Sequence, residues 1–213
     1  DGFIAAGWQP IREGDHVIAL SSGDAQITLA PGGQFELAAR PVADDRLFGS
    51  DLDEHLARLA EVSRPLGLAW LSMGFRPFGQ RDDVPWMPKQ RYGVMRGYMP
   101  GVGSRGLDMM LRTATVQANF DFSDEADAAA KLRCLYGVTS ILTALWANSP
   151  IVDGRPSGFQ SYRAYVWRDT DPARCGLLRF IGSRDDVFRA YTEWALDIPM
   201  YFVYRGGYRA VEN

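Results

Sequence analysis

Cysteine and histidine are scarce in this chain of 213 residues, which contains two of each. A structural zinc site needs about four such ligands in close spacings, and neither cysteine has a CxxC partner, so such a site has almost no ligand supply. Two thiols in a long chain favour the reduced state, and a disulfide between Cys134 and Cys175 is the alternative. Cys134 falls on an apolar stripe, where we expect a small buried thiol.

The chain also lacks an excess of either charge and any long apolar run. Its 23 basic and 26 acidic residues give a net charge of −3, so bulk charge does not indicate a nucleic-acid partner. No run of about 18 apolar residues occurs, and no basic segment leads into an apolar one at the start. We therefore expect no membrane partner, no targeting segment and a cytoplasmic location.

Several catalytic signatures are missing as well. The sequence has no GxxxxGK[ST] phosphate loop, no HExxH zinc motif and no GxSxG nucleophile turn. Residues 101–106 spell a loose GxGxxG, but they follow a loop rather than a predicted strand, which makes the motif weak as a dinucleotide fingerprint. No nucleophile lies near His16 or His55 in the sequence, so we assign no catalytic residue.

What is present is the composition of a globular protein, with 46% apolar and 23% charged residues. No repeat, low-complexity tract or linker divides it, so we predict a single catalytic-type domain over residues 1–213. Segments 16–20, 26–30 and 34–37 are apolar or alternate with the period of two that is typical of strands. In the last of them, Glu36 lies on the side opposite Phe35.

Three later segments have helical spacing and capping residues, at residues 50–64, 123–149 and 183–198. The second carries a long apolar stripe and is predicted to be the central helix of the core. Residues 200–211 predict a hairpin around a glycine turn. Together these segments predict an α+β fold, an antiparallel β-sheet with helices packed on one face.

The intervening segments are less regular. We predict a buried strand over 66–75, an irregular basic loop over 76–106, and strands over 111–122 and 161–167. The basic loop is either a solvated loop with aromatic anchors or a lid that brings positive charge to an anionic substrate. The strand at 111–122 places five polar side chains on one side. That side suits either a wet sheet face or the binding of Mg²⁺ or a polar substrate.

A series of short motifs, read in order, resembles the plant and proteobacterial type of glutamate–cysteine ligase. The resemblance spans almost the whole chain. The motifs are GGQFEL (32–37), MPKQRY (87–92), MRGYMP (95–100), GLDMM (106–110), RTATVQANFDFS (112–123), TALWANSP (143–150), WRDTD (167–171) and LDIPMYF (196–202).

The resemblance implies an ATP-dependent ligase. In that family the γ-carboxylate of L-glutamate is phosphorylated, and the amine of L-cysteine then attacks the acyl phosphate, the first step of glutathione synthesis. Such chemistry needs metal ions and basic groups to neutralise and position phosphates. The resemblance therefore also implies a glutamine-synthetase-like sheet, Mg²⁺ as cofactor and only small-molecule partners, with no nucleic acid and no membrane. The oligomeric state stays open, with a dimer as one option.

The resemblance further implies roles for individual residues. Arg163 resembles the arginine that clamps the glutamate carboxylate, and Arg91 and Tyr201 resemble residues that line the glutamate and cysteine pockets. Glu36 and Gln117 stand where the family places its metal site. Further contacts are expected from the substrate-side residues Tyr98 and Trp167, and from the phosphate-side residues Lys89, Arg96, Asn119 and Arg205.

Some features of the family are absent from the sequence. Its members carry a Gly-x-Glu-x-Glu strand before the region that begins this chain, and they continue beyond the region that ends it. Residues 178–182 also depart from the family's Leu-Pro-Phe run. Because one strand carboxylate is a poor cage for Mg²⁺, we expect the chain to be part of a longer protein. Two alternatives stay open, the same chemistry with another amine acceptor and a non-catalytic paralogue that holds glutamate or nucleotide.

Overall fold

The computed structural model describes residues 2–211, apart from the side chain of Asp45. Its internal contacts divide the chain into two compact units. The first unit comprises Asp1–Ser72 and Pro85–Lys89, and the second comprises Met73–Val84 and Gln90–Asn213. The single catalytic-type domain over residues 1–213 stays a prediction.

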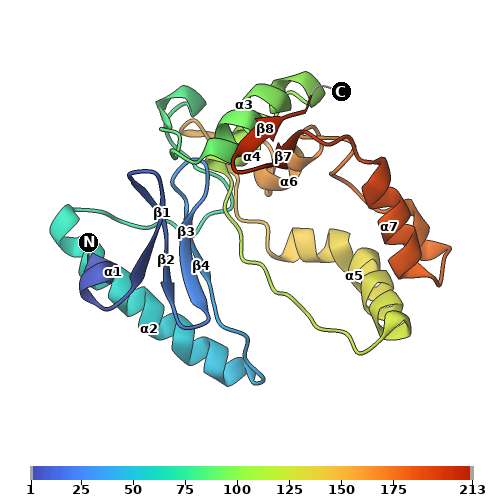
Figure 1. Cartoon of the computed structure of the whole chain (residues 1–213), viewed down its shortest axis with the longest axis horizontal. Helices are drawn as coiled ribbons and strands as arrows, with labels where there is room; N and C mark the ends of the chain where they lie inside the picture. Colours follow the sequence, from blue (N-terminus) through green and yellow to red (C-terminus); the bar gives the residue numbers. More distant parts are fainter. Residues whose placement is uncertain (1, 212–213) are drawn as a thin grey trace. The chain divides into compact units, whose positions relative to one another are not determined.

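The first unit is built on a four-stranded antiparallel sheet in the order β1–β2–β3–β4 (Figure 1). Leu20, Ile27 and Leu37 are directly paired across β2, β3 and β4, so they lie in one row on one face of the sheet. The three strands predicted between residues 16 and 37 are confirmed. The strand bounds are β1 Gln9–Glu13, β2 His16–Ser22, β3 Ala25–Leu29 and β4 Phe35–Ala38.

Two helices cover that face, α1 Gly2–Ala5 and α2 Asp45–Ser63 (Figure 1). Phe3 from α1 and Leu59 from α2 form a buried cluster with Ile27 of β3. Burying large apolar side chains on one sheet face provides the main stabilisation of such a layer. The α+β class and the antiparallel strand pairing are therefore confirmed.

The predicted start of the long helix is wrong by about one turn. Asp44 rather than Ser50 caps α2, because its side chain accepts a 2.8 Å hydrogen bond from the backbone N–H of Arg46. The helix ends as expected, in a 3₁₀ turn at Arg64–Leu66 that is followed by Gly67 in the left-handed conformation.

The buried strand predicted over residues 66–75 is also wrong. Leu66, Leu68 and Leu71 are exposed and belong to no strand. Only Phe75 pairs, through an isolated antiparallel bridge to Thr113, and both residues belong to the second unit. Residues 66–75 therefore have the apolar composition of a strand, but no neighbouring strand pairs with them beyond the bridge at Phe75.

The second unit is mainly helical. Helix α4 contacts both α3 and α6, and α3 contacts β8, so these elements gather in one group (Figure 1). Two small antiparallel hairpins, β5–β6 and β7–β8, complete the unit, and the second is the hairpin predicted at 200–211. The bounds are α3 Gln90–Val102, α4 Gly106–Arg112, α5 Glu125–Leu145, α6 Tyr162–Trp167, α7 Val187–Asp197, β5 Ile151–Val152, β6 Arg155–Pro156, β7 Phe202–Tyr204 and β8 Tyr208–Ala210.

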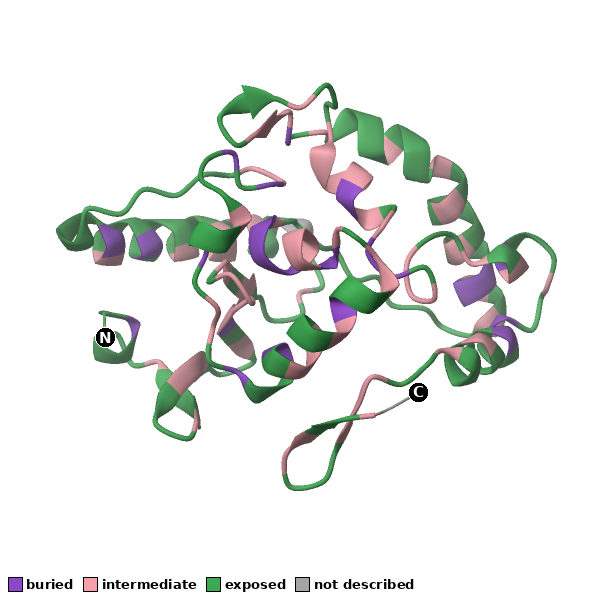
Figure 2. Ribbon diagram, turned by 90° about the horizontal axis from the view of Figure 1, so that it is seen from above, coloured by how far each residue is buried: buried purple, intermediate pink, exposed green. Residues whose placement is uncertain are grey.

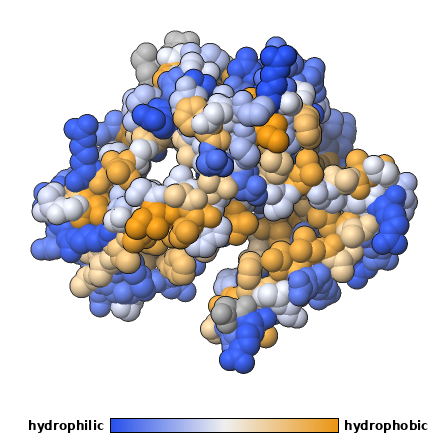
Figure 3. Space-filling view, turned by 180° about the vertical axis from the view of Figure 1, so that it is seen from behind, coloured by the Kyte–Doolittle hydropathy of each residue, from blue (hydrophilic) through white to orange (hydrophobic). Residues whose placement is uncertain are grey.

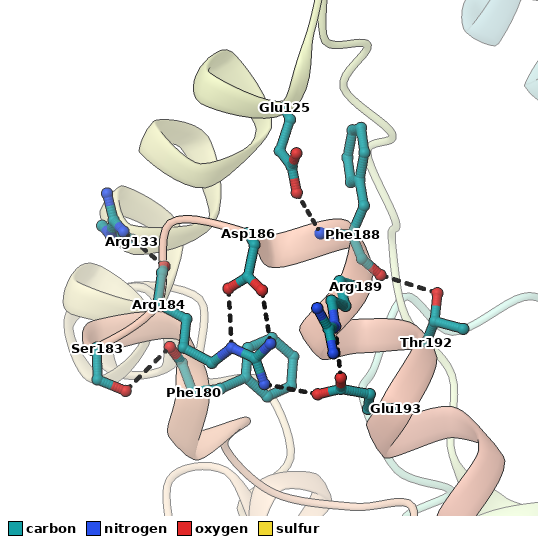
Figure 4. Close-up of polar contacts among 10 residues, drawn as sticks. All are labelled: Glu125, Arg133, Phe180, Ser183, Arg184, Asp186, Phe188, Arg189, Thr192 and Glu193. Carbon is teal, nitrogen blue, oxygen red and sulfur yellow. Dashed lines mark hydrogen bonds and ion pairs between the residues drawn. The ribbon is translucent and has the colours of Figure 1, made fainter.

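Polar side chains tie α5 to α7 and to the turn before it (Figure 4). Glu125 accepts a 2.8 Å hydrogen bond from the N–H of Phe188 in the first turn of α7, where helix N–H groups lack partners. Arg184 grips Asp186 with two hydrogen bonds and reaches Glu193 at 2.7 Å. Hydrogen bonds from Arg184 lower the pKa of Asp186 and of Glu193 below their ordinary values.

Helix α5 is not the central helix of a core. Ala128 and Ala129 are its buried residues, whereas Leu135 and Ile141 are exposed and Leu145 is 70% exposed. Exposed residues dominate the long helices in Figure 2, and broad apolar patches reach the surface in Figure 3. Cys134 on α5 is likewise exposed, so the prediction of a buried thiol there is wrong. Both cysteines are free thiols, as favoured from the sequence.

Three further predictions for this unit are wrong. Residues 76–106 are not one irregular loop, because they contain a 3₁₀ turn at Arg81–Asp83 and helix α3. Residues 114–122 form no strand, and Val116 is 90% exposed. Residues 162–167 form a helix rather than a strand.

Candidate binding site on helix α6

Helix α6 has only six residues, and neighbouring groups fix where it begins. The Ser161 side chain caps it by accepting a 3.3 Å hydrogen bond from the N–H of Ala164. Ser149 is almost fully buried, and its hydroxyl accepts a 3.0 Å hydrogen bond from the backbone N–H of Arg163. A helix this short is marginal alone, so these contacts decide its position.

Arg163 and Trp167 lie one helical turn apart on α6 and therefore on the same face. The Arg163 guanidinium lies 5.7 Å from the centre of the Trp167 ring. Arg163 Nε and Trp167 Nε1 are both buried, and neither has a hydrogen-bond partner among residues 2–211. Buried donors without an acceptor are rare in folded proteins, so this pair can take an acceptor that the described residues do not supply.

The electrostatics of Arg163 point to an anionic acceptor. Burial lowers the pKa of its guanidinium below the ordinary value, and no carboxylate contributes to that shift. A partly buried cation without an opposite charge carries a desolvation cost that an incoming carboxylate offsets. A guanidinium can also grip a carboxylate through two parallel hydrogen bonds.

Tyr165 does not share the face of Arg163, as it would in the strand predicted at 161–167. In a helix, residues two apart point in different directions, and Tyr165 has its own partners. Its ring stacks on Phe159 at 4.3 Å and lies 4.2 Å from the Arg105 guanidinium, which donates a 2.8 Å hydrogen bond to the Tyr165 hydroxyl. Trp167, four residues after Arg163, shares its face.

A second group of predicted substrate residues forms around two tyrosines of the second unit. The rings of Tyr98 on α3 and Tyr201 before β7 lie 4.7 Å apart. The Arg174 guanidinium lies 4.2 Å from the centre of the Tyr201 ring and donates a 3.2 Å hydrogen bond to the Tyr98 hydroxyl. The structure therefore brings Tyr98 and Tyr201 together, and it adds a basic residue that the sequence motifs did not single out.

Arg91 lies on α3 beside the β7–β8 hairpin. It donates a 3.4 Å hydrogen bond to the Tyr92 hydroxyl, and this bond is the largest cause of a raised Arg91 pKa. The neighbouring Gln90 side chain accepts a 2.9 Å hydrogen bond from the N–H of Tyr208 in β8. The hairpin thus holds the start of α3, and with it Arg91.

The remaining predicted site residues are divided between the two units. Lys89 is buried in the first unit, and the exposed Glu36 lies on β4 and accepts a 3.2 Å hydrogen bond from Thr28. Gln117 donates a 2.9 Å hydrogen bond to Asn119 on the exposed, irregular segment 114–122. The other two are exposed, on α3 and in the β7–β8 turn, and they are Arg96 and Arg205. The metal-binding and phosphate-binding roles of these residues stay predictions.

The described residues do not fit a complete magnesium site. Within residues 2–211, no group of three His, Cys, Asp or Glu side chains lies close enough to hold a metal ion. Gln117 lies in residues 114–122, which do not form a strand with one polar face, and Glu36 is the one carboxylate predicted as a metal ligand. Mg²⁺ prefers about six oxygen ligands, which these two side chains do not supply.

The loose GxGxxG at residues 101–106 has a packing role. A Cβ atom at Gly103 would stand 2.5 Å from the carbonyl oxygen of Thr170, and one at Gly106 would stand 2.8 Å from Met99. The N–H of Arg105 also donates a 2.9 Å hydrogen bond to the carbonyl of Asp169. Gly103 therefore lets the end of α3 approach the loop after α6, and Gly106 lets the start of α4 approach Met99 of α3.

Comparison with known proteins decides the family. The family model described as Glutamate-cysteine ligase family 2 (GCS2) matches residues 2–212. The chain belongs to this family.

Similar proteins include plant enzymes that are longer than this chain. The chain is 48% identical over 200 residues to the chloroplastic glutamate–cysteine ligase of Brassica juncea, covering 94% of this chain and 39% of that protein. It is 47% identical to the chloroplastic enzyme of Arabidopsis thaliana, covering 93% of this chain and 38% of that one. The chloroplastic ligase A of Oryza sativa subsp. japonica is 46% identical, with 93% and 40% covered. The chain spans about two-fifths of the length of these relatives.

The predicted cytoplasmic location is wrong on this evidence. The relatives of Brassica juncea, Medicago truncatula, Arabidopsis thaliana and Nicotiana tabacum are all named as chloroplastic enzymes. In the part of the chain that the structure describes, no helix combines the length and apolarity needed to cross a membrane.

Two positions around these sites could not be found from motifs alone. Ser149 lies in the TALWANSP motif, but only the fold reveals that its hydroxyl anchors α6. Arg174 follows Asp171 by three residues, a spacing that allows an ion pair within one turn and is the one local signal that pointed to it.

Proposed function

We propose that this chain is part of an ATP-dependent ligase that joins the γ-carboxylate of L-glutamate to the amine of L-cysteine through a γ-glutamyl phosphate. Membership of the glutamate–cysteine ligase family supports this proposal. So do the names of relatives that are 46–48% identical over nearly the whole chain. The proposal extends the activity of those longer proteins to the protein that contains this chain.

The observation that carries the proposal is the pair of partnerless donors on α6. Arg163 Nε and Trp167 Nε1 are buried on one helix face and have no acceptor in the part of the chain that the structure describes. A glutamate α-carboxylate supplies oxygen acceptors and the negative charge that Arg163 lacks. A neutral ligand would satisfy the hydrogen bonds but leave the buried charge without an opposite charge.

The role of these residues is to bind and orient rather than to react. The α-carboxylate must stay fixed while the γ-carboxylate at the other end of glutamate is activated, and a two-point grip limits rotation of the substrate. Burial beside the Trp167 ring keeps water away from Arg163 and strengthens its attraction to an anion. Tyr98 and Tyr201 provide aromatic surface for a second part of the substrate site.

We also propose the glutamine-synthetase-like sheet and a single catalytic-type domain that the family resemblance implies. The four-stranded antiparallel sheet of the first unit, with α1 and α2 on one face, is consistent with that architecture. Glu36 on β4 is proposed as a metal ligand. Because the described residues do not assemble a magnesium site, we assign no catalytic step to the metal.

The test is the Arg163→Lys substitution in the protein at its full natural length. Lysine keeps the charge but cannot form the two parallel hydrogen bonds or use Nε. Steady-state ADP release at varied glutamate should show a KM for glutamate raised about tenfold, equal to about 1.4 kcal/mol, with the KM for ATP little changed. Trp167→Phe, which removes only the indole donor, should raise the glutamate KM by a smaller factor.

The matched control is Arg168→Lys, at the exposed residue that directly follows α6. It should leave both KM values unchanged. An unchanged glutamate KM in Arg163→Lys, or an equal loss for ATP, would remove Arg163 from the glutamate clamp. Glutamate binding without ADP release in the parent protein would support the non-catalytic paralogue, and faster turnover with another amine would replace cysteine as the acceptor.

A further inference from the structure

Arg174 stands at the centre of a contact set that joins three separate segments of the second unit. It donates to the Tyr98 hydroxyl on α3 at 3.2 Å and to the carbonyl oxygen of Pro199, which lies two residues before Tyr201. Its guanidinium also stacks 4.2 Å from the centre of the Tyr201 ring and 5.5 Å from that of Tyr98. One side chain therefore contacts Tyr98 through a hydrogen bond and its ring, and Tyr201 through its ring, while also binding the backbone at Pro199.

Arg174 is itself held by a buried acid. Asp171 is 2% exposed, and its Oδ2 lies 2.7 Å from the Arg174 guanidinium. The second carboxylate oxygen of Asp171, Oδ1, accepts a 3.1 Å hydrogen bond from the N–H of Ala173. The backbone carbonyl of Asp171 accepts a 3.0 Å hydrogen bond from the N–H of Arg174. The backbone of the turn at residues 171–174 therefore holds the Asp171 carboxylate in place, and the carboxylate in turn holds the Arg174 guanidinium.

The loop that carries this pair is packed directly on the end of α3. Gly103 approaches the carbonyl oxygens of Asp169 and Thr170 so closely that a Cβ atom would clash with both. Ser104 donates hydrogen bonds from its N–H and its hydroxyl to the Asp169 side chain. Arg174 thus projects from a loop that is fixed relative to α3, and Tyr98 lies on that helix.

We infer that Arg174 is a positioning residue, which sets the relative geometry of Tyr98 and Tyr201 so that the two rings form one wall of the amino-acid substrate site. Without it, Tyr201 would keep its neighbours Tyr98 and Phe202, but the hydrogen bonds that join the Pro199 carbonyl and the Tyr98 hydroxyl through one side chain would be lost. The inference rests on the proposed function, since it assumes that Tyr201 contacts a substrate. The planar guanidinium suits this task because it stacks and donates in several directions at once, whereas lysine offers a point charge.

Two readouts test it, and the first does not depend on activity. In protein labelled with 3-fluorotyrosine, the ¹⁹F signals of Tyr98 and Tyr201 are assigned with Tyr98→Phe and Tyr201→Phe. Arg174→Gln should shift both signals and leave those of the remaining tyrosines in place. Arg189→Gln, which removes an exposed arginine paired with Glu193 on α7, is the matched control and should shift neither.

The second readout is kinetic. Arg174→Gln should raise the KM for the amino-acid substrate that contacts Tyr201 about tenfold, with kcat within about twofold and the KM for ATP unchanged. In a Tyr201→Ala background, Arg174→Gln should have no further effect, because the two residues act through one structure. Arg174→Lys should recover only part of the loss. If Arg174→Gln does not fold, Arg174→Lys and Asp171→Asn take its place in both readouts.

Each failure has a distinct meaning. Unchanged ¹⁹F signals for both tyrosines would overturn the inference, whatever reaction the protein catalyses. Shifted signals with unchanged KM values in an active enzyme would also overturn it, because the tyrosine geometry would then not matter to the substrate. A parent protein that does not turn over glutamate would refute the proposed function instead, and it would do so before any Arg174 variant is compared.

Discussion

The Lys89 ammonium group donates a 2.9 Å hydrogen bond to the carbonyl oxygen of Leu29, the last residue of β3. Lys89 is only 8% exposed, and two residues before it the N–H of Met87 donates a 2.8 Å hydrogen bond to the carbonyl of Pro31. These two contacts dock residues 85–89 on the end of the sheet within the first unit. The buried ammonium group of Lys89 therefore has a structural role in the first unit, in addition to the phosphate-binding role predicted from the sequence.

Replacing Lys89 with methionine should therefore loosen the sheet. The change keeps most of the side-chain volume but removes a charged donor, and a hydrogen bond to a charged group contributes about 1.5–3 kcal/mol. Hydrogen exchange followed by mass spectrometry should show faster exchange in β3 and β4. The control is Arg58→Met, an exposed residue of α2 in the same unit, which should leave that exchange unchanged. Unchanged exchange in Lys89→Met would mean that the Leu29 contact contributes little.

Gly103→Ala should destabilise the second unit. The new Cβ atom would stand 2.5 Å from Thr170 O and 2.7 Å from Asp169 O, and backbone atoms cannot rotate away as a flexible side chain can. Overpacking of this kind costs about 1–3 kcal/mol, which urea unfolding followed by circular dichroism will measure.

The matched control for that change is Gly101→Ala, two residues earlier, near the end of α3. No atom lies within 4 Å of a Cβ placed there, so alanine should be neutral or stabilise the helix by up to about 1 kcal/mol. Equal effects at Gly101 and Gly103 would contradict the close approach to Thr170. They would also contradict the packing role assigned to the glycines of residues 101–106.

Acid should weaken the first unit through His55. Its ring packs 5.8 Å from that of Phe35 and 6.1 Å from that of Phe3, and burial lowers its pKa below the ordinary value of about 6.5. The folded state therefore disfavours the protonated form. The stability that the neutral ring provides is complete above the ordinary pKa and is lost as the pH falls from there through the lower folded-state pKa.

The measurement compares thermal unfolding at about pH 7.5 and about pH 5.5 in the parent and in His55→Phe. The fall in melting temperature should be smaller in the variant, because it cannot take up that proton. His16→Gln changes the chain's other histidine, which is exposed on β2, and should keep the parent's dependence. The same fall in His55→Phe as in the parent would show that other groups cause the acid effect.

Much of the first unit was predictable because its signals are local. The period of two in 26–30 and 34–37, the turn residues between those segments, and the Pro65 and Gly67 stop after α2 each act within a few residues. Burial on one sheet face then follows from the alternation, as the row Leu20, Ile27 and Leu37 shows. Family membership was also readable, because a series of motifs retains its order along the chain.

The second unit was harder because its elements depend on partners. Residues 113–122 alternate like a strand, yet a strand needs a neighbour to accept its hydrogen bonds, and alternation alone does not supply one. Helix α3 contains three glycines and a proline, so its sequence argued against the helix that tertiary packing produces. In residues 161–167, six helical residues are too few to separate a period of 3.6 from a period of two.

The sequence by itself determined the family, the antiparallel strands of the first unit and the choice of Arg163 as the candidate carboxylate clamp. Only the tertiary structure decided that Trp167, and not Tyr165, shares the face of Arg163, and that both lack an acceptor. It also decided that Arg174 joins Tyr98 to Tyr201, residues that lie 103 positions apart. The physical reason is that residue types and caps act over one or two turns of chain, whereas burial and hydrogen-bond partners are set by segments that meet only on folding.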